Sequence, residues 1–492
     1  MKTNPLGPKE DFFVLATLRV RTYAVTDIPC KIYLPARPIS KPRFDFKPTQ
    51  EQWQQVSVFW QVTFEAKLLD RFGRTTDWIY APEVYLENKS TTQWGPNLYD
   101  CVFSGQPQNL RVVHYLNQDP HQDKSENTRF VLWLSPNSML QPAMIATSSY
   151  AGNVEMEKLD QLRVELTPDI HLEFDREFRH ENIPNQGTLH WSFLVANTTS
   201  PCAADDVDKF NSSVLPTVDD FLWIAGLGSR TRTACVGWAA SDGRTYTRYY
   251  RGNLVFPTGS QEPTLGPGLV SLGDYEEFLS TCWSAFRVHP GKEAIRGAIQ
   301  ALVPDRHQTL EESFLALFAG LEELVLDYRV RNDLESIITN SNEWRKIRNA
   351  IKNAIKKSID PAIDRHQRAL LYTKLNEINR VPLQYAFRRF CSDCGIDVSD
   401  VWPIFATSEG VGLADVRNKL IHGNRFPDGL INALSIARDN LKWVLERAVV
   451  RVLGWLVERT ELAPMFLSAN DTSLTGMPEA RRQLSEYLAS RS

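Results

Sequence analysis

Several features that would mark a membrane or secreted protein are missing from this sequence of 492 residues. No stretch approaches the ~18 consecutive apolar residues that a membrane helix requires. The segment Met1–Pro8 contains no apolar core, so we expect no secretory signal. A formal net charge of −4 by itself favours neither a nucleic-acid binder nor an enzyme for acidic substrates. We therefore expect a cytoplasmic protein with no membrane partner.

Metal and phosphate motifs are also scarce. The seven cysteines, at positions 30, 101, 202, 235, 282, 391 and 394, are mostly isolated, which is typical of reduced thiols rather than of a disulfide framework. Cys391 and Cys394 have the spacing of half a zinc site, but no second pair lies nearby, so we interpret them as two thiols at a helix end. Gly226–Arg230 lacks the spacing of a phosphate-binding loop. No metal and no cofactor are expected.

The first half of the chain has the pattern of a β-sheet. From Phe12 to about Pro257 apolar and polar residues alternate, most clearly over Val56–Leu68, which predicts one long half-buried strand. Frequent proline and glycine separate the apolar runs. The pattern favours an antiparallel sandwich or barrel-like assembly, in one or two lobes, that serves as a sensor or regulatory region. Its ligand cannot be deduced from these residues.

After about residue 266 the apolar period changes to that of helices. The fold class is therefore α+β and multidomain: a β-rich region at 1–265, a helical connector at 266–304, a helical bundle at 305–460 and a tail at 461–492. Thr309 followed by Glu312 is a helix start signal. The other predicted helices cover about 274–284, 292–302, 334–359, 364–391 with a break at Pro382, 413–422, 429–459 and 479–488.

Positive charge is concentrated in the predicted bundle. Between Trp344 and Arg389 the chain has twelve Lys and Arg residues but three Asp and Glu residues. A solvated helix face is the usual explanation of such a run, yet in a chain of net negative charge phosphate contact is the stronger hypothesis. The residues that we assign to RNA contact are Arg345, Lys346, Arg348, Lys352, Lys356, Lys357 and, in a later helix, Lys419.

That later helix contains the most informative stretch, Arg417–Gly423. On a helical wheel Arg417 falls inside the apolar stripe formed by Leu413, Val416 and Leu420, while Asn418 and His422 share another face. A guanidinium in an apolar stripe must find an acid or an interface. One interpretation is purely structural: Arg417 pairs with Glu322 or Glu323 of an earlier helix, and His422 caps the helix end.

The other interpretation rests on the pattern itself. Arg417, Asn418 and His422, in the order Arg-Asn-x-x-x-His late in a bundle of four or five helices, resemble the Arg-x4-His motif of the HEPN superfamily of ribonucleases. A long β-rich half followed by such a bundle resembles the ApeA family of bacterial anti-phage proteins. The motif resemblance covers about residues 304–459, and for the first half it is one of architecture only.

The resemblance implies metal-independent RNA cleavage in which the 2′-hydroxyl of the RNA is the nucleophile. It assigns catalysis to Arg417, His422 and Asn418 alone. A histidine can exchange protons near neutral pH, and an arginine can stabilise charge on the phosphate without a metal. The expected partners are RNA, with unpaired loops such as those of tRNA as targets, a second copy that completes the active site, and a phage-derived activator.

Two alternatives stay open. In the first, the bundle is a non-catalytic HEPN module that binds RNA or a nucleotide. In the second, it is a structural oligomerisation bundle that carries a β-rich ligand-binding domain. Because one straight helix does not bring Arg417 and His422 together, the catalytic interpretation depends on a site shared between two chains.

Overall fold

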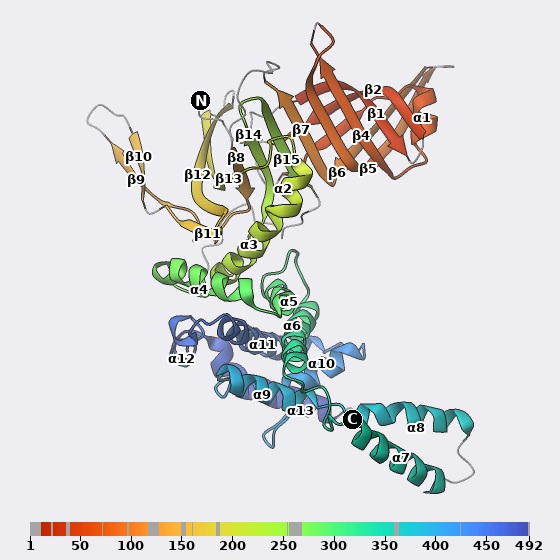
Figure 1. Ribbon diagram of the computed structural model, residues 1–492, viewed down its shortest axis with the longest axis vertical. Helices are drawn as coiled ribbons and strands as arrows, with labels where there is room; N and C mark the ends of the chain where they lie inside the picture. The colour runs from red at the N-terminus through yellow and green to blue at the C-terminus, as the bar shows by residue number, and fades with distance from the viewer. Residues whose placement is uncertain are drawn as a thin grey trace. The chain divides into compact units, whose positions relative to one another are not determined.

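The computed structural model describes residues 11–20, 23–35, 40–70, 72–95, 98–116, 127–148, 154–159, 161–183, 187–252, 254, 268–358, 364–423 and 425–490. The chain divides into two compact units: unit 1 comprises Met1–Ser280 with Asp305–His307, and unit 2 comprises Thr281–Pro304 with Gln308–Ser492. Unit 1 is mainly antiparallel sheet and unit 2 is helical (Figure 1). The α+β organisation expected from the sequence is thereby confirmed.

Among the described residues of unit 1, thirteen strands form one sheet in the order β11-β12-β13-β8-β14-β15-β7-β5-β4-β1-β2-β3-β6, and β9 pairs with β10 separately. The strands are β1 (Asp11–Val20), β2 (Tyr23–Tyr33), β3 (Arg43–Phe46), β4 (Gln61–Leu69), β5 (Thr75–Gly95), β6 (Leu98–Pro107), β7 (Asn109–Tyr115), β8 (Thr128–Leu134), β9 (Ala143–Ser148), β10 (Val154–Leu159), β11 (Arg163–Thr167), β12 (Ile170–Ile183), β13 (Gly187–Ser200), β14 (Cys235–Ser241) and β15 (Thr245–Arg251).

The long strand β5 joins two parts of this sheet. One edge of β5 pairs with β4, while the other edge pairs first with β7 and then with β6. The β5–β6 pairing closes β5, β4, β1, β2, β3 and β6 into a barrel, and β7 begins an open sheet. The register shifts between Glu87 and Ser90, where Asn88 has a φ of 49°. Such a bulge bends a strand, so β5 can pair with β7 of the open sheet near its start and with β6 of the barrel further along.

The barrel interior is filled by inward-facing aromatic and aliphatic side chains. Phe44, Phe46 and Phe64 are almost fully buried, and the ring centroids of Phe44 and Phe64 lie 4.5 Å apart. Phe103 stacks on Phe46 at 4.6 Å. The alternation seen in the sequence therefore corresponds to a closed, packed core rather than to a ligand cavity.

In the described part of unit 1, three helices interrupt the strand pattern: α1 (Gln50–Val56), α2 (Val207–Ser213) and α3 (Leu215–Ser229). The single long strand expected over Val56–Leu68 is therefore wrong, because α1 ends at Val56 and β4 begins at Gln61. Helix α3 escaped detection because it is buried on most sides, so it shows no amphipathic period. It contacts β11 and β14 of the open sheet (Figure 1).

Unit 2 is built from helices and short 3-10 turns. They are α4 (Tyr275–Val288, which begins in unit 1), α5 (Lys292–Leu302), α6 (Leu310–Arg331), α7 (Ser341–Ser358), α8 (Arg365–Ile378), α9 (Leu383–Cys394), α10 (Leu413–Ile421), α11 (Ile431–Val452), α12 (Pro464–Asn470) and α13 (Thr472–Ala489). None of the helices in the described ranges is both long and apolar enough to cross a membrane.

Most predicted helix bounds agree with the structure. Thr309 is the N-cap of helix α6, and its side chain and that of Glu312 form the expected reciprocal cap. Helix α7 starts later than expected because Ile337 donates to the carbonyl of Asn379, which holds this segment in an extended bridge. The last predicted long helix ends at Val452, before Gly454 with its φ of 78°.

The segment expected to be a tail belongs to the helical unit, because α13 packs along α11. Helix α11 also contacts α5, α6 and α9, so it lies at the centre of the bundle. Arg447 of α11 is 1% exposed and donates to Asp400 at 2.8 Å and to the carbonyl of Leu462 at 2.8 Å. A buried charge with a carboxylate and carbonyl partners is compatible with a stable core.

Replacing Phe64 by alanine tests the barrel core. Phe64 is fully buried between Phe44 and Phe46, so Phe64→Ala is expected to lower the free energy of unfolding of unit 1 by about 3–5 kcal/mol. The control is Phe13→Ala on β1, because Phe13 is 73% exposed, and its effect should stay below about 0.5 kcal/mol. Chemical denaturation followed by tryptophan fluorescence measures both, and equal effects would contradict the closed barrel.

Candidate functional site

Helix α10 carries the residues singled out by the motif. The backbone N–H of Gly412 donates to Asp415 at 2.8 Å, which caps the start of the helix. A side chain at Gly412 would not fit, because a Cβ there would lie 2.3 Å from the carbonyl carbon of Phe405. The helix ends at Ile421 with His422 as its C-cap, and Gly423 follows with a φ of 74°, a conformation that favours glycine. The predicted bounds of this helix are confirmed.

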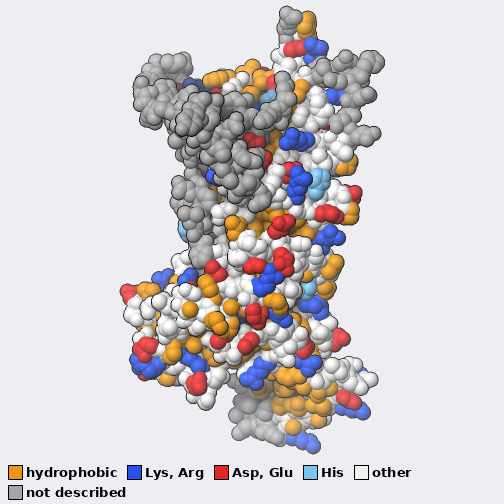
Figure 2. Space-filling model, turned by 90° about the vertical axis from the view of Figure 1, so that its left-hand side faces the viewer, with side chains coloured by type: hydrophobic (Ala, Val, Ile, Leu, Met, Phe, Trp, Pro, Cys, Tyr) orange, Lys and Arg blue, Asp and Glu red, His pale blue; other side chains and the backbone are white. Residues whose placement is uncertain are grey.

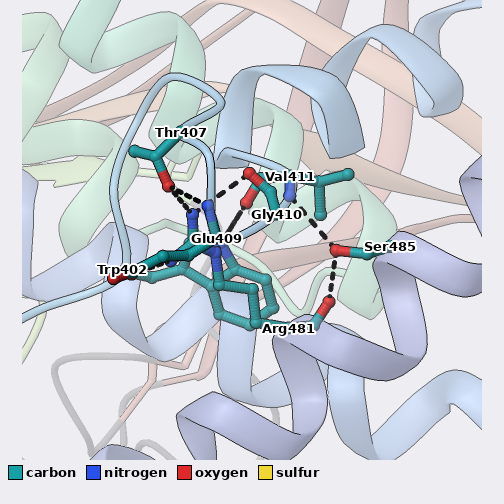
Figure 3. A network of polar contacts seen from close by, with 7 residues as sticks. All are labelled: Trp402, Thr407, Glu409, Gly410, Val411, Arg481 and Ser485. Atoms are coloured by element: carbon teal, nitrogen blue, oxygen red, sulfur yellow. Dashed lines mark hydrogen bonds and ion pairs between the residues drawn. The ribbon is translucent and has the colours of Figure 1, made fainter.

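The loop that leads into α10 is held by α13 (Figure 3). Arg481 is 9% exposed and donates to the carbonyls of Val411 at 3.0 Å and of Gly410 at 3.1 Å, as well as to the hydroxyl of Thr407. Ser485 accepts from the backbone N–H of Val411 at 3.1 Å. The C-terminal helix thus determines where α10 begins, and the sequence alone contained no sign of this role.

Arg417 points toward α6. Its Nη2 donates to Glu322 Oε2 at 2.8 Å, its Nη1 donates to Asn418 Oδ1 at 3.2 Å, and its guanidinium lies 5.6 Å from the centre of the Phe318 ring. The Arg417 and Glu322 side chains are 29% and 25% exposed, so water partly screens the pair. This pairing is the one that the structural interpretation expected.

Asn418 and His422 face solvent at the end of α10. His422 occupies the C-cap position, and its backbone N–H donates to the carbonyl of Asn418 at 3.3 Å. Arg417 is directed to α6 while the His422 side chain is exposed, so a single chain does not show the two acting on one substrate atom. Lys419 is half-buried, with its Nζ 5.8 Å from the Tyr487 ring centre of α13.

The basic run lies on α7, which forms a helical hairpin with α8 (Figure 1). None of the residues 341–357 is fully buried. Arg348 and Lys352 are half-buried, and Arg345, Lys346, Lys356 and Lys357 are exposed. Exposed Ile347, Leu370 and Leu371 lie among them. At the lower end of Figure 2, which contains this hairpin, apolar side chains gather with Lys and Arg beside them. The hairpin therefore presents both charge and apolar surface.

A cleft that the sequence did not reveal lies between α6 and α9. It has a volume of about 500 Å³ and is lined by Glu322, Leu326 and Arg329 of α6, by Glu377 near the end of α8, and by the segment 380–383. Residues 322, 326 and 329 share one face of α6 because they are four and three positions apart. Glu322, whose carboxylate pairs with Arg417, is thus also one of the residues that line this cleft.

Two arginines dominate the charge of the cleft. Arg329 is 6% exposed, and its Nη1 donates to the carbonyl of Val381 at 3.3 Å, whereas its Nε has no partner in the described part of the chain. Burial, and next the nearby Arg380, lower the pKa of Arg329 below its ordinary value, and Glu335 opposes them. Among the described residues Arg329 and Arg380 form no ion pair, whereas Glu377 pairs with Lys374 at 2.8 Å.

Cys391 and Cys394 lie at the end of α9 as half-buried thiols without a disulfide. Burial raises the pKa of Cys391 to about 12, followed in importance by the neighbouring Cys394. A high pKa disfavours the thiolate, which is the form that binds metals. Within the described ranges, no group of three or more His, Cys, Asp or Glu side chains has the geometry to hold a metal ion.

Comparisons of this chain with protein-family models, with curated proteins and with solved structures found no match.

Replacing Arg481 tests whether α13 positions α10. Arg481→Ala removes hydrogen bonds to Val411, Gly410 and Thr407, so we expect a loss of about 3 kcal/mol in the free energy of unfolding and faster hydrogen exchange in α10. The adjacent Arg482 is 56% exposed and, among the described residues, its ion pairs are with Glu479 and Glu486 of its own helix, so Arg482→Ala is the matched control, with an effect below about 1 kcal/mol. Unchanged exchange in α10 would contradict the assignment.

Proposed function

We propose that this chain is a regulated endoribonuclease of the HEPN type that acts in anti-phage defence. Unit 2 would cleave RNA without a metal, and unit 1 would respond to a phage-derived signal and control the nuclease. The observation that carries the proposal is that Arg417, Asn418 and His422 lie together on α10, with Asn418 and His422 exposed at its end, in a helical unit that also contains the basic helix α7.

The chemistry follows from the residue types. A base removes the proton of the 2′-hydroxyl, the 2′-oxygen attacks phosphorus, and the bond to the 5′-oxygen breaks as that oxygen takes up a proton. The products are a 2′,3′-cyclic phosphate and a 5′-hydroxyl. His422 is exposed and suited to either proton transfer. Arg417 would stabilise charge on the phosphate, and Asn418 would orient the histidine or a phosphate oxygen.

A site shared by two chains fits the geometry best. Arg417 contacts Glu322 and is directed to α6, while His422 faces solvent, so a histidine of a second copy is needed to reach the phosphate that Arg417 binds. In the single chain Glu322 already neutralises Arg417. An RNA phosphate that binds Arg417 must therefore displace the Glu322 carboxylate. This competition keeps the isolated chain less active than the assembled one.

RNA would be held by the basic hairpin. Helix α7 contains six Lys and Arg residues and one acid, Glu343, and its cations are exposed or half-buried. Such a surface binds the phosphate backbone without sequence preference. The exposed apolar residues of the hairpin are suited to contact with unpaired bases, so single-stranded loops such as those of tRNA are the targets we propose.

A second candidate function has a specific observation in its favour. The Arg417–Glu322 ion pair and the C-cap position of His422 are what a non-catalytic module would also have. In that case unit 2 would bind RNA or a nucleotide without cleaving it. A third candidate, a purely structural oligomerisation bundle, predicts no RNA affinity at all. Measurements of RNA cleavage, RNA binding and oligomeric state distinguish the three candidate functions.

Alanine substitutions of the motif test catalysis. Cells that express the full chain are infected with phage, and RNA ends that carry a 2′,3′-cyclic phosphate are counted. Arg417→Ala and His422→Ala should each lower their number by at least about 100-fold, because each removes charge stabilisation or proton transfer. Cleavage by an activated lysate should persist in EDTA.

Two exposed residues outside the site provide the controls. His171→Ala in β12 and Arg482→Ala in α13 should leave cleavage unchanged. If both motif variants cleave as well as the wild type, the catalytic proposal is wrong. If RNA still binds but is never cleaved, the non-catalytic module is the better description. Mixing the two inactive motif variants should restore some cleavage if the site is shared between chains.

Charge removal on α7 tests the RNA-binding surface. Lys356→Gln with Lys357→Gln should reduce the slope of log K against log salt by about 1.4, because each phosphate contact to single-stranded RNA contributes about 0.7. Fluorescence anisotropy with an uncleavable 2′-O-methyl RNA measures the slope. Lys67→Gln with Lys209→Gln in unit 1 removes the same charge elsewhere and should leave it unchanged. A slope that falls equally in both double variants would contradict the assignment.

A further inference from the structure

The cleft between α6 and α9 contains a buried arginine that forms no ion pair with a carboxylate in the described part of the chain. In the described residues of unit 2 the buried arginines are Arg329, Arg447 and Arg481. Arg447 pairs with Asp400 and Arg481 pairs with Glu409, whereas Arg329 has no carboxylate partner among them. A buried cation is costly unless an opposite charge compensates it.

The surroundings of Arg329 increase the free-energy cost of burying its charge. The exposed Arg380 also lines the cleft without an ion pair in the described part of the chain, and two guanidinium groups near one another repel. The two carboxylates of the cleft are neutralised by cations outside its lining: Glu322 by Arg417 at 2.8 Å, and Glu377 by Lys374 at 2.8 Å. The charge of Glu335 acts on Arg329 from beyond ion-pair distance, so no carboxylate of the described residues is paired with either arginine of the cleft.

The N-terminus of α9 adds hydrogen-bond donors that, like the arginines, favour an anion. Helix α9 has twelve residues, begins at Leu383 in the cleft wall, and has Pro382 as its N-cap without a side-chain hydrogen bond to the helix. The first backbone N–H groups of a helix have no partner within it, and the helix dipole favours an anion there. Guanidinium forks and backbone N–H groups are the donors that phosphate oxygens accept from.

We propose that the α6–α9 cleft is a phosphate-binding site in which Arg329, Arg380 and the start of α9 hold a phosphoryl group of a nucleotide or of an RNA chain. The anion supplies the ion-pair partner that Arg329 lacks among the described residues. Because Glu322 lines the same cleft and pairs with Arg417, an RNA phosphate bound here would lie beside the motif helix α10. Binding in the cleft does not depend on cleavage and is measured separately from it.

Phosphate affinity of the full-length protein tests the site. Equilibrium dialysis with inorganic phosphate, with 5′-AMP and with a 2′-O-methyl RNA tetranucleotide measures affinity, and thermal unfolding with and without phosphate measures stabilisation. The ionic strength is matched with chloride. Arg380→Gln should weaken binding by at least about tenfold, because it removes a charge-assisted hydrogen bond to phosphate. Arg380 is exposed, so this variant should fold normally.

Arg329→Met provides an independent test. Without phosphate it should melt at the wild-type temperature or above, because a buried charge without an ion pair is removed, and phosphate should no longer raise that temperature. A merely structural arginine would instead lower the melting temperature when replaced. The matched control is Arg388→Gln, an exposed arginine of α9 outside the cleft lining, which should bind like the wild type.

The probes distinguish the two sources of phosphate. If inorganic phosphate and 5′-AMP bind the wild type and this binding is lost in both Arg380→Gln and Arg329→Met, the ligand is a soluble nucleotide. If the tetranucleotide alone binds the wild type and both variants lose that binding, the ligand is RNA. Equal affinity in the wild type, Arg380→Gln and Arg388→Gln, or no binding of any probe, would overturn the proposal. His422→Ala should retain phosphate binding even where cleavage is lost, so failure of the nuclease proposal and failure of this one give different results.

Discussion

The geometry of the candidate site depends on one buried arginine in the last helix. Helix α10 has nine residues, and helices of this length are not stable by themselves in water. Arg481 fixes the carbonyls of the loop before it, and Gly412 lets the chain pass close to Phe405. From this fixed start, the helical repeat alone directs Arg417 toward α6 and leaves Asn418 and His422 at the solvent-facing end.

Buried arginines have two different roles in unit 2. Arg447 and Arg481 have acidic partners and carbonyl acceptors, so each connects segments far apart in the chain. Among the described residues, Arg329 donates to one carbonyl, at 3.3 Å, and forms no ion pair, although the charges of Arg380 and Glu335 both act on it. The same residue type thus stabilises the bundle at two places and lacks an ion pair at a third. Arg329 lies on the face of α6 that also holds Glu322, which links the cleft to Arg417.

Local sequence signals predicted much of the fold. Thr309 with Glu312, the proline at 382 and the glycine at 423 marked helix ends that the structure confirms, since caps and breaks depend on neighbouring residues only. Helix α3 was missed because burial on most sides removes the amphipathic period that identifies helices. The barrel closure was beyond reach too, because it depends on β5 pairing with β6 and β7 along one edge.

By itself the sequence determined that Arg417, Asn418 and His422 share one helix, that this helix ends at Gly423, and that positive charge concentrates on the helix of Arg345–Lys357. Only the tertiary structure decided which acid Arg417 meets, that α13 holds the entry to α10, and that Arg329 and Arg380 meet in a cleft. These contacts join residues that are fifty to ninety-five positions apart, for example Glu322 and Arg417, which are 95 apart. No local pattern records such pairs, because they are set by how the helices pack.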